Sequence, residues 1–472
     1  MPPLMLSKRL SSVQGVRLAG ASSTWDINIH YPPDCPGGII ASCTPHHNAT
    51  PGNDPASTPL ALPALTHPHI HLDKAFVHSA REYAHLLPST GSFQEALSVT
   101  TVAKQRFTRP DLLNRGEWLV AESVSWGVTA MRAFVEVDHT VKLICLDAAM
   151  DLKSQWNDVC EIQIVCFAQD PIFSTQHGEE NRDFLETALE QYPQIDVIGT
   201  TPYVESTIEA AKRNIDWAID RALQLDKHLD FHLDYNLDSS KEALLWHVLH
   251  SLRQRGWTGS STAKRVMLGH CTRLTLLADE KWREVSRIIH DNDLPVSFVG
   301  LPTSDLYMAS PPPDPNGAPD RPRGTLRVPE MIRKHDLDAV IGVNNVGNAF
   351  TPWGPPDPLF LACLGVGVYQ AGTQADAELL YECVSTRARA AIGLSPSHSN
   401  IAVKEGERPD FLVFHNRDVT GCGIAARPRS SVAEIVWDPP AQLNRDVLFN
   451  GRLKRSGLPT LRNDFSYVFS TE

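Results

Sequence analysis

The stretch ALPALTHPHIHLDKAF, residues 61–76, places three histidines within five positions and follows them with an aspartate and a lysine. His69 and His71 are two positions apart, so on a β-strand both side chains would point to the same face. Two imidazoles at one strand end can then share one metal ion. In a chain with 19 histidines an isolated pair of this kind is commonly accidental. The metal interpretation therefore depends on whether further ligands follow later strands.

The bulk composition is that of an ordinary globular protein. The chain has 472 residues, of which 42% are hydrophobic and 21% charged, which suits two or three domains or one large barrel with additions. Its formal net charge of −12 argues against a nucleic-acid-binding surface. No apolar stretch is long enough to span a bilayer, and the N-terminus lacks the apolar core of a secretory signal. The nine cysteines form no CxxC pair, so we expect a cytoplasmic protein.

Short apolar runs alternate with longer amphipathic ones from residue 62 onward. The predicted strands are residues 64–72, 128–137, 161–169, 196–204, 229–235, 265–271, 295–302 and 339–345. Helical patterns lie between them, among them residues 207–226, 240–257 and 279–293. Continuous apolar strands are typical of parallel sheets covered on both faces. Eight strand–helix units over roughly 280 residues predict an α/β fold of the (β/α)8 TIM barrel type. An open doubly wound sheet is the alternative, but no G-x-G-x-x-G follows the first strand.

The two ends of the chain contain short strand-like pieces in place of this alternation. These pieces are residues 15–20, 24–30, 409–414, 432–437 and 445–454. Both ends can pair into one small unit beside the barrel. We therefore expect residues 1–61 and 394–472 to form the two halves of an accessory β-sandwich, and residues 62–393 to form the barrel.

Residues 308–324, MASPPPDPNGAPDRPRG, are too rich in proline and glycine for a helix or a central strand. The segment follows the seventh predicted strand, which would place it on the catalytic face of a barrel as a loop or lid. A flexible insertion with no role in the site is equally consistent with this composition.

Two further histidines follow later strands. His232 lies near the end of the fifth predicted strand, in DFHLDYN, and His270 near the end of the sixth, in MLGHCT. In a barrel, active-site residues come from the carboxyl ends of the strands. With His69 and His71 they make four histidines at one face, which we interpret as ligands of one divalent metal ion. Imidazole ligands suit Zn or Fe, which lower the pKa of a bound water.

The sequence resembles the amidohydrolase superfamily, specifically its cytosine deaminase-like branch, over about residues 60–415. HPHIHLD resembles the first-strand motif of that family, and residues 163–174, QIVCFAQDPIFS, resemble its third-strand segment. Residues 340–359, VIGVNNVGNAFTPWGPPDPL, resemble its eighth strand and the loop that follows. The resemblance implies a TIM barrel with an accessory β-sandwich. It also implies a metal-dependent hydrolase in which Gln169 binds the substrate edge.

Two positions depart from the family pattern. Where the family has a glutamate that shuttles protons, three residues after the fifth-strand histidine, this chain has Tyr235. Where the family has an eighth-strand aspartate that binds the metal and accepts a proton, this chain has Asn344. An asparagine can offer a carbonyl oxygen to a metal but takes no proton at neutral pH. A phenol with a pKa near 10 is a poor replacement for a carboxylate.

Two hypotheses follow from the motifs and their departures. The first is a hydrolase that acts on a non-peptide C–N bond of a cyclic amide, amidine or heterocyclic amine. Its catalytic residues would be His270, Tyr235 and Asn344, and Asn344 would join the four histidines as a metal ligand. The second is a catalytically impaired member of the same family that binds a metal or small molecule. Under both hypotheses we expect the protein to bind a small heterocyclic molecule and neither nucleic acid nor a membrane. The sequence leaves open whether the chain forms a homo-oligomer.

Overall fold

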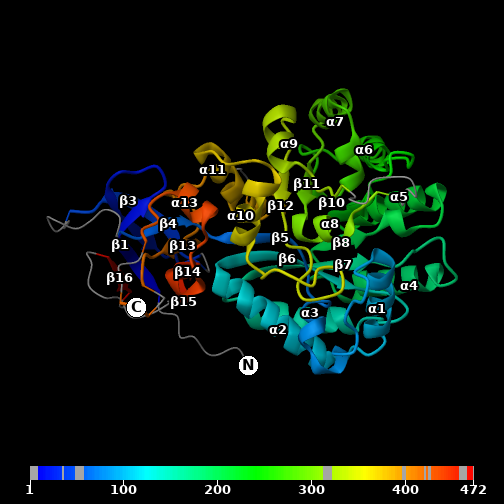
Figure 1. Ribbon diagram of the computed structural model, residues 1–472, viewed down its shortest axis with the longest axis horizontal. Coiled ribbons are helices and arrows are strands. Elements are labelled where there is room, and N and C mark those ends of the chain that lie inside the picture. The colour runs from blue at the N-terminus through cyan, green and yellow to red at the C-terminus, as the bar shows by residue number, and fades with distance from the viewer. Residues whose placement is uncertain are drawn as a thin grey trace.

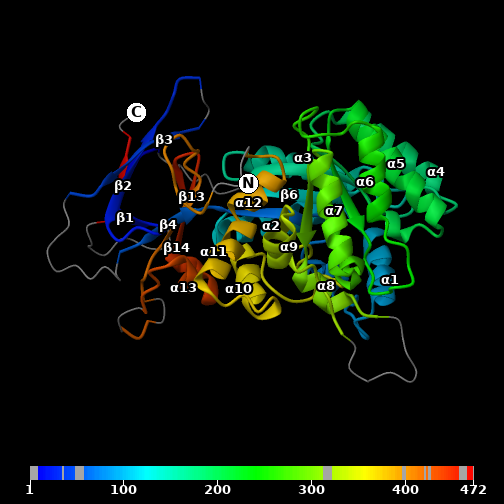
Figure 2. The same cartoon turned by 90° about the horizontal axis from the view of Figure 1, so that it is seen from above.

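The computed structural model describes residues 9–34, 37–47, 58–311, 322–395, 400–418, 421–423, 427–455 and 465–470. The chain forms an eight-stranded parallel barrel with a second sheet beside it (Figures 1 and 2). The barrel strands are β5 (Leu65–His71), β6 (Val128–Glu136), β7 (Glu161–Ala168), β8 (Val197–Thr200), β9 (His228–Leu233), β10 (Val266–His270), β11 (Val296–Gly300) and β12 (Ala339–Ile341). Neighbours in the sheet are neighbours in the chain, so every connection is a simple parallel crossover.

Hydrogen bonds between the first barrel strand and the segment after the last one bring the two sheet edges together. The amide of His71 donates to the carbonyl of Asn344 at 2.8 Å, and the amide of Asn344 donates to the carbonyl of His69 at 3.1 Å. Ile70 and Asn344 form a parallel bridge at the same place. The predicted TIM barrel is confirmed, and its point of closure contains residues that were predicted to bind the metal.

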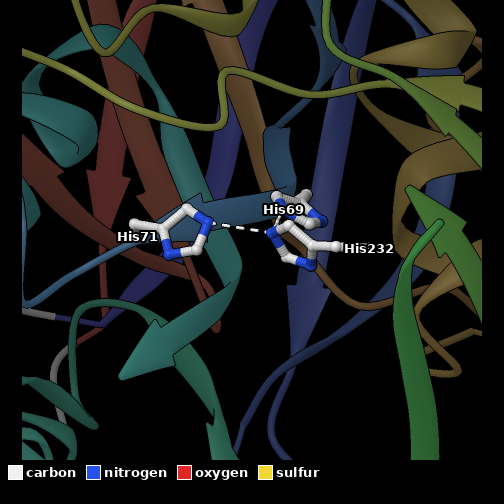
Figure 3. Close-up of side chains that lie close together, drawn as sticks. All are labelled: His69, His71 and His232. Carbon is white, nitrogen blue, oxygen red and sulfur yellow. Dashed lines mark hydrogen bonds between the residues drawn. The ribbon is translucent and has the colours of Figure 1, made fainter. Parts of the chain in front are cut away.

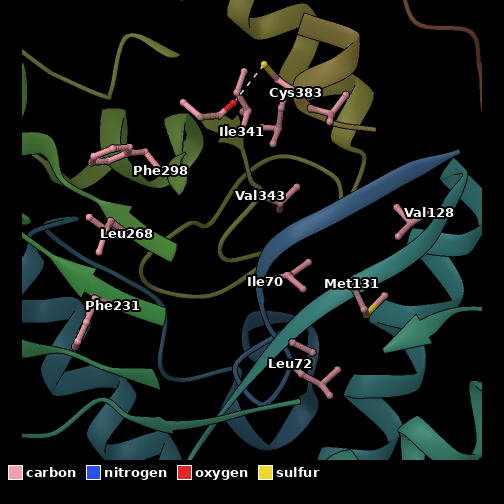
Figure 4. Close-up of a cluster of buried hydrophobic side chains, with 14 of the residues drawn as sticks. Ile70, Leu72, Val128, Met131, Phe231, Leu268, Phe298, Ile341, Val343 and Cys383 are labelled. Atoms are coloured by element: carbon pink, nitrogen blue, oxygen red, sulfur yellow. Dashed lines mark hydrogen bonds between the residues drawn. The ribbon is translucent and has the colours of Figure 1, made fainter. Parts of the chain in front are cut away.

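Helices surround the barrel and cover its outer face (Figure 1). They are α1 (Phe93–Lys104), α2 (Arg109–Trp126), α3 (Ile144–Trp156), α4 (Gly178–Gln191), α5 (Ile208–Gln224), α6 (Leu245–Gln254), α7 (Asp279–Asp291), α8 (Pro302–Met308), α9 (Val328–His335), α10 (Pro358–Val368), α11 (Gln374–Cys383) and α12 (Thr386–Ala391). The strands beneath them are buried on both faces, as their continuous apolar runs predicted. Phe231, Leu268 and Phe298, on three successive strands, belong to this core (Figure 4).

The chain ends build the second sheet together. Its strands are β1 (Leu10–Leu18), β2 (Thr24–His30), β3 (Ile39–Pro45), β4 (Leu60–Pro63), β13 (Phe411–Phe414), β14 (Arg445–Phe449), β15 (Arg452–Arg455) and β16 (Ser466–Phe469). N- and C-terminal strands join where β4 pairs antiparallel with β13 and where β1 pairs with β16. The prediction that both ends form one β unit is confirmed, and the strands make one continuous hydrogen-bonded sheet of mixed direction.

A buried ion pair connects this sheet to the barrel helices. Arg445 on β14 donates from both guanidinium ends to Asp357, which precedes α10, at 2.9 and 2.8 Å. Neither side chain is more than 3% exposed. The bidentate geometry fixes the orientation of the two groups, which stabilises the contact between the sheet and the barrel.

One secondary-structure prediction was wrong. Residues 432–437, expected as a strand, form the helix α13 (Val432–Trp437). The hydroxyl of Ser431 accepts a hydrogen bond from the amide of Glu434, and the Glu434 carboxylate accepts one from the Ser431 amide. This capping box starts the helix. Val432, Ile435 and Val436 then lie on one buried helical face, at a spacing that was interpreted as a strand.

Most of the proline-rich segment 308–324 lies outside the described residues, which end at 311 and resume at 322. Its role as a loop or lid stays a prediction. Among the helices that the structure describes, none has both the length and the apolar character needed to cross a membrane.

Candidate metal centre

Histidines predicted from the sequence meet at the carboxyl ends of the barrel strands. His69 and His71 lie on β5, and His232 lies one residue before the end of β9. The alternation of side chains along a strand turns His69 and His71 to the same side, the barrel interior, while Ile70 between them packs into the hydrophobic core. All three histidines are at most 2% exposed.

The three imidazole rings converge through their Nε2 atoms (Figure 3). His232 Nε2 lies 3.2 Å from His69 Nε2 and 3.1 Å from His71 Nε2. One nitrogen from each ring lies within 4.8 Å of the other two. Each Nδ1 atom is buried without a hydrogen-bond partner among the described residues. With no partner at Nδ1, each ring can carry its proton there and present an Nε2 lone pair to a common ion.

These rings are neutral at physiological pH. Burial lowers the pKa of His69, His71 and His232 well below the ordinary value of histidine. Repulsion between the rings and from Lys74 lowers the pKa of all three further. A neutral imidazole offers a nitrogen lone pair, which is the form that binds a metal. The donor set therefore suits a divalent ion such as zinc or iron.

Asn344 supplies an oxygen beside this group. Its amide nitrogen donates to Ser304 Oγ at 2.8 Å. Its Oδ1 atom is buried and has no well-formed hydrogen bond within the described part of the chain. Asn344 also has a positive φ of 68°, a conformation that costs a non-glycine residue energy and occurs often at functional sites. The side chain is thus oriented with a free carbonyl oxygen, which fits the predicted role of a metal ligand.

His270 ends β10 and lies next to the three-histidine group without belonging to it. Its ring centroid is 5.1 Å from that of His232 and 6.3 Å from that of His69. Its Nδ1 atom bonds Asp305 Oδ1 at 2.9 Å. With Nδ1 held in this way, the Nε2 edge of the ring faces the pocket that His270 lines. Its predicted metal-ligand role stays a proposal, and its hydrogen bond to a carboxylate suits a proton-transfer role.

Asp305 is a site residue that sequence reasoning missed. It lies in α8, five residues after the end of β11, and is fully buried. Thr325 Oγ1 donates to it at 2.7 Å and the Leu301 amide at 3.1 Å. Burial raises the pKa of Asp305, and the hydrogen bond from His270 opposes this. Its signal in the sequence was a carboxylate shortly after the seventh predicted strand.

Tyr235, in the position of the family's glutamate, lines the same pocket. Its ring packs on His270 with centroids 3.9 Å apart, and its hydroxyl donates to the carbonyl of Ser304 at 3.4 Å. Burial and the nearby Asp305 carboxylate raise the pKa of Tyr235 well above its ordinary value. The phenol therefore stays protonated, so it can donate a hydrogen bond but does not act as a base near neutral pH.

Gln169 lies directly after β7, as predicted, and its Oε1 atom accepts a hydrogen bond from Lys74 Nζ at 3.2 Å. Lys74 also pairs with Glu136 at 2.6 Å. Glu136 in turn pairs with Lys104 of α1 at 2.5 Å. Lys104 reaches Asp138 as well, at 2.5 Å. We call Lys74, Lys104, Glu136 and Asp138 the charge cluster.

A small pocket, lined in part by His71 and His232, opens to solvent beside the three-histidine group. Phe93 of α1 and Phe350, whose rings are 6.0 Å apart, form apolar parts of its wall. Lys74, Gln169, His270 and Asn344 supply polar groups. Apolar walls with a few converging polar groups are typical of a small-molecule site.

Two other groups of side chains in the described residues have metal-like spacing. In one, Asp138 and Asp170 already pair with Lys104. In the other, both carboxylate oxygens of Asp279 bind Lys334, at 2.8 and 2.7 Å. The three-histidine group differs from both because no lysine or arginine neutralises it.

Neither a protein-family model nor a curated protein matches the chain by sequence. Solved structures do match it. One is a 5-methylcytosine deaminase from Klebsiella pneumoniae with bound 5-fluorocytosine, with a TM-score of 0.76 and 20% identity, covering 96% of this chain and 99% of that one. Another is an N-isopropylammelide isopropylaminohydrolase from Burkholderia multivorans, with a TM-score of 0.69 and 22% identity, covering 94% and 97%.

A third match is an adenosine deaminase from Xanthomonas campestris with bound zinc, with a TM-score of 0.58 and 14% identity, covering 93% of this chain and 90% of that one. At these identities the matches establish the fold, and they do so over nearly the whole chain. The chain therefore has the fold of these solved structures, with a buried three-histidine group that can hold a metal ion.

Proposed function

We propose that this protein is a metal-dependent hydrolase that acts on a non-peptide C–N bond of a cyclic amide, amidine or heterocyclic amine. The observation that carries the proposal is the convergence of three neutral imidazole nitrogens on one point at the open end of the barrel. The proposal is supported by the solved structures of the same fold, which include a cytosine-type deaminase with a bound pyrimidine and an aminohydrolase.

His69, His71 and His232 would hold the metal, and the free Oδ1 of Asn344 would complete the donor set. A divalent ion in this position acts as a Lewis acid and makes water a nucleophile at neutral pH. Asn344 replaces a carboxylate by a neutral oxygen, so it can bind the ion but cannot take a proton.

His270 and Asp305 are the groups that can move a proton in this pocket. The carboxylate of Asp305 accepts a hydrogen bond from Nδ1 of His270 and fixes the orientation of the ring. His270 Nε2 can then accept a proton from the attacking water and return it to the leaving nitrogen. Tyr235 stays protonated, packs against the ring and donates a hydrogen bond. Gln169 would contact the substrate edge.

A second candidate function is binding without turnover. It is favoured by Tyr235 and Asn344, because the family's two proton-handling carboxylates are both replaced. In this case the protein would hold a metal or a small molecule, and the pair of His270 and Asp305 would not suffice for proton transfer.

The experiment that tests the proposal has two stages. Purified protein is analysed for bound metal and then assayed for ammonia or amine release from pyrimidines, triazines and lactams. The proposal expects about one divalent ion per chain and release from at least one compound. Loss of ammonia or amine release in His232→Leu would show that the activity depends on the three-histidine group, because this change leaves His270 and Asp305 in place. Metal uptake with no release from any compound supports binding without turnover.

The double change Tyr235→Glu with Asn344→Asp separates the two candidates further. If the wild type is impaired, the double variant should recover more activity than the two single changes combined, because each missing carboxylate blocks one step of the same pathway. General acid–base groups contribute about 10²- to 10⁴-fold. If the wild type is an enzyme that depends on the Tyr235 hydroxyl, Tyr235→Phe should abolish its activity and the carboxylate changes should damage it. Efficient wild-type deamination of cytosine would contradict our interpretation of both substitutions.

A further inference from the structure

We infer that the pocket selects an anionic heterocycle, with Lys74 as the residue that recognises the negative charge. This inference rests on the proposed function and goes further by naming the class of substrate. Its central observation is the charge of the pocket wall. Among the described residues that line the pocket, one is a lysine and none is an aspartate or glutamate.

Lys74 is placed to bind a ligand. Its side chain is 3% exposed, and its Nζ atom lies 5.5 Å from the ring centroid of Phe350, which lines the pocket. The ammonium group forms an ion pair with Glu136 and donates a hydrogen bond to Gln169. Among the described residues no further acceptor binds it, so at least one proton is available to a ligand. An oxygen anion is the preferred partner, because charge-assisted hydrogen bonds are stronger than neutral ones.

The counter-ion of Lys74 does not cancel this preference. Glu136 is 1% exposed and lies behind Lys74, outside the pocket wall. Its second carboxylate oxygen binds Lys104 at 2.5 Å, so Glu136 is shared between two lysines. A ligand in the pocket would contact Lys74 directly and would lie farther from Glu136. Coulomb attraction falls with distance, so the nearer cation dominates.

Gln169 is oriented by the same lysine. Its Oε1 accepts from Lys74, and its side chain interacts with Tyr203, whose pKa burial raises. One lone pair of the amide oxygen is therefore held by a cation, which leaves the N–H groups as the main groups that Gln169 can offer a ligand. Lys74 and Gln169 together form a donor-rich corner. A neutral amide edge, which pairs one donor with one acceptor, fits this corner less well than an edge that carries two acceptor oxygens.

The two departures from the family motif, Tyr235 and Asn344, also favour an anionic ligand. Tyr235 and Asn344 put a protonated phenol and a neutral amide where two carboxylates would repel an anion. Asn345, the next residue along, also lines the pocket and is neutral. Asp305, a buried carboxylate near the site, does not line the pocket and holds His270 by a hydrogen bond. The substitutions that weaken a conventional proton shuttle thus also remove negative charge from the pocket.

The negative charge can be a carboxylate on the ring or an ionised ring oxygen, and two matched pairs of probes distinguish these. Orotate is compared with its neutral carboxamide, and barbiturate, ionised at neutral pH, is compared with uracil. Binding is measured by calorimetry in EDTA, so that a metal ion cannot supply the attraction. The wild type should bind at least one anion about 10- to 100-fold more tightly than its neutral partner, the range of a hydrogen bond to a charged group.

Lys74→Gln should reduce that preference to less than about threefold. This variant leaves Glu136 paired with Lys104, so the fold should persist, and Lys281→Gln on the exposed face of α7 serves as control. Equal binding of both members of each pair by the wild type overturns the inference without any variant. A preference that survives in Lys74→Gln overturns it as well. Failure to take up metal contradicts the proposed function, whereas the EDTA comparison still decides the role of Lys74.

Discussion

Two buried polar groups, the charge cluster and the three-histidine group, lie side by side at the open end of the barrel. They differ in whether the chain itself supplies the partners of their polar atoms. In the charge cluster, Lys74 and Lys104 face Glu136 and Asp138 at 2.5–2.6 Å, so opposite charges neutralise each other within the chain. In the three-histidine group, three imidazole nitrogens converge, with contacts of 3.1–3.2 Å, and no charged partner lies among them. The first group balances its charges without a ligand, and the second can hold a cation.

This difference predicts opposite responses to mutation. The charge cluster should matter for folding with or without metal, because removing Lys104 leaves the buried Asp138 without its cation. The three-histidine group should matter for metal binding and little for the stability of the metal-free protein, because neutral imidazoles with unbonded nitrogens contribute little to it. The predictions below test this contrast in order of decreasing effect.

The largest effect is expected from Lys104→Met. This change removes the cation shared by Glu136 and Asp138, both at most 1% exposed. The free energy of unfolding should fall by about 3–5 kcal/mol, as for other broken buried ion pairs. Denaturant unfolding in EDTA measures it. Lys153→Met is the matched control, because Lys153 pairs with Asp196 at the same distance of 2.5 Å but both side chains are at least 28% exposed. The control should lose about 1 kcal/mol or less, and equal losses in the two variants would contradict the account.

The second prediction concerns pH. Because the pKa of each of the three histidines is lowered in the folded state, the unfolded chain takes up protons below pH 6.5 that the folded chain does not. Stability of the metal-free protein is therefore fully present above pH 6.5 and is lost as pH falls, by up to about 1.4 kcal/mol per pH unit for each histidine.

His71→Leu removes one of these groups at similar volume. Between pH 7.5 and pH 5 its loss of stability should be smaller than that of the wild type by about 2 kcal/mol. Unfolding curves at both pH values, in EDTA, supply the comparison. His78→Leu, at a half-buried histidine outside the group, is the control and should have a smaller effect. Parallel pH profiles for the wild type and His71→Leu would mean that these rings are not held neutral.

A smaller effect is expected from Asn344→Asp. A carboxylate replaces the free Oδ1 atom that faces the histidines, so zinc affinity should rise by about tenfold or more, because hard oxygen anions bind divalent ions better than amide oxygens do. Competition with a chelator measures the affinity. Asn345→Asp adds the same charge one residue along, where Oδ1 already accepts a hydrogen bond from Asn348 at 2.8 Å. If both variants raise affinity equally, Asn344 is not a ligand and the effect is only one of charge.

The sequence predicted the barrel and the histidines because both depend on local patterns. Strands buried on both faces are apolar runs, and ligands from one strand, such as His69 and His71, show their spacing directly. Asp305 and the charge cluster were missed because their partners are far apart in the chain. Lys104 lies in a helix that only the fold brings to Glu136. Residues 432–437 were misassigned because a short apolar run fits a strand or a helix, and the capping box of Ser431 and Glu434 was overlooked.

The most direct test of the central claim is the zinc dependence of stability. Wild type and His71→Leu are unfolded in EDTA and again with free zinc at 100 times the dissociation constant of the wild type. The account predicts a gain of about 2.7 kcal/mol for the wild type and almost none for His71→Leu, while in EDTA near pH 7.5 the two proteins differ by less than about 1.5 kcal/mol. A wild type that zinc does not stabilise, or a variant that gains as much, would contradict the claim that the three-histidine group is completed by a metal ion.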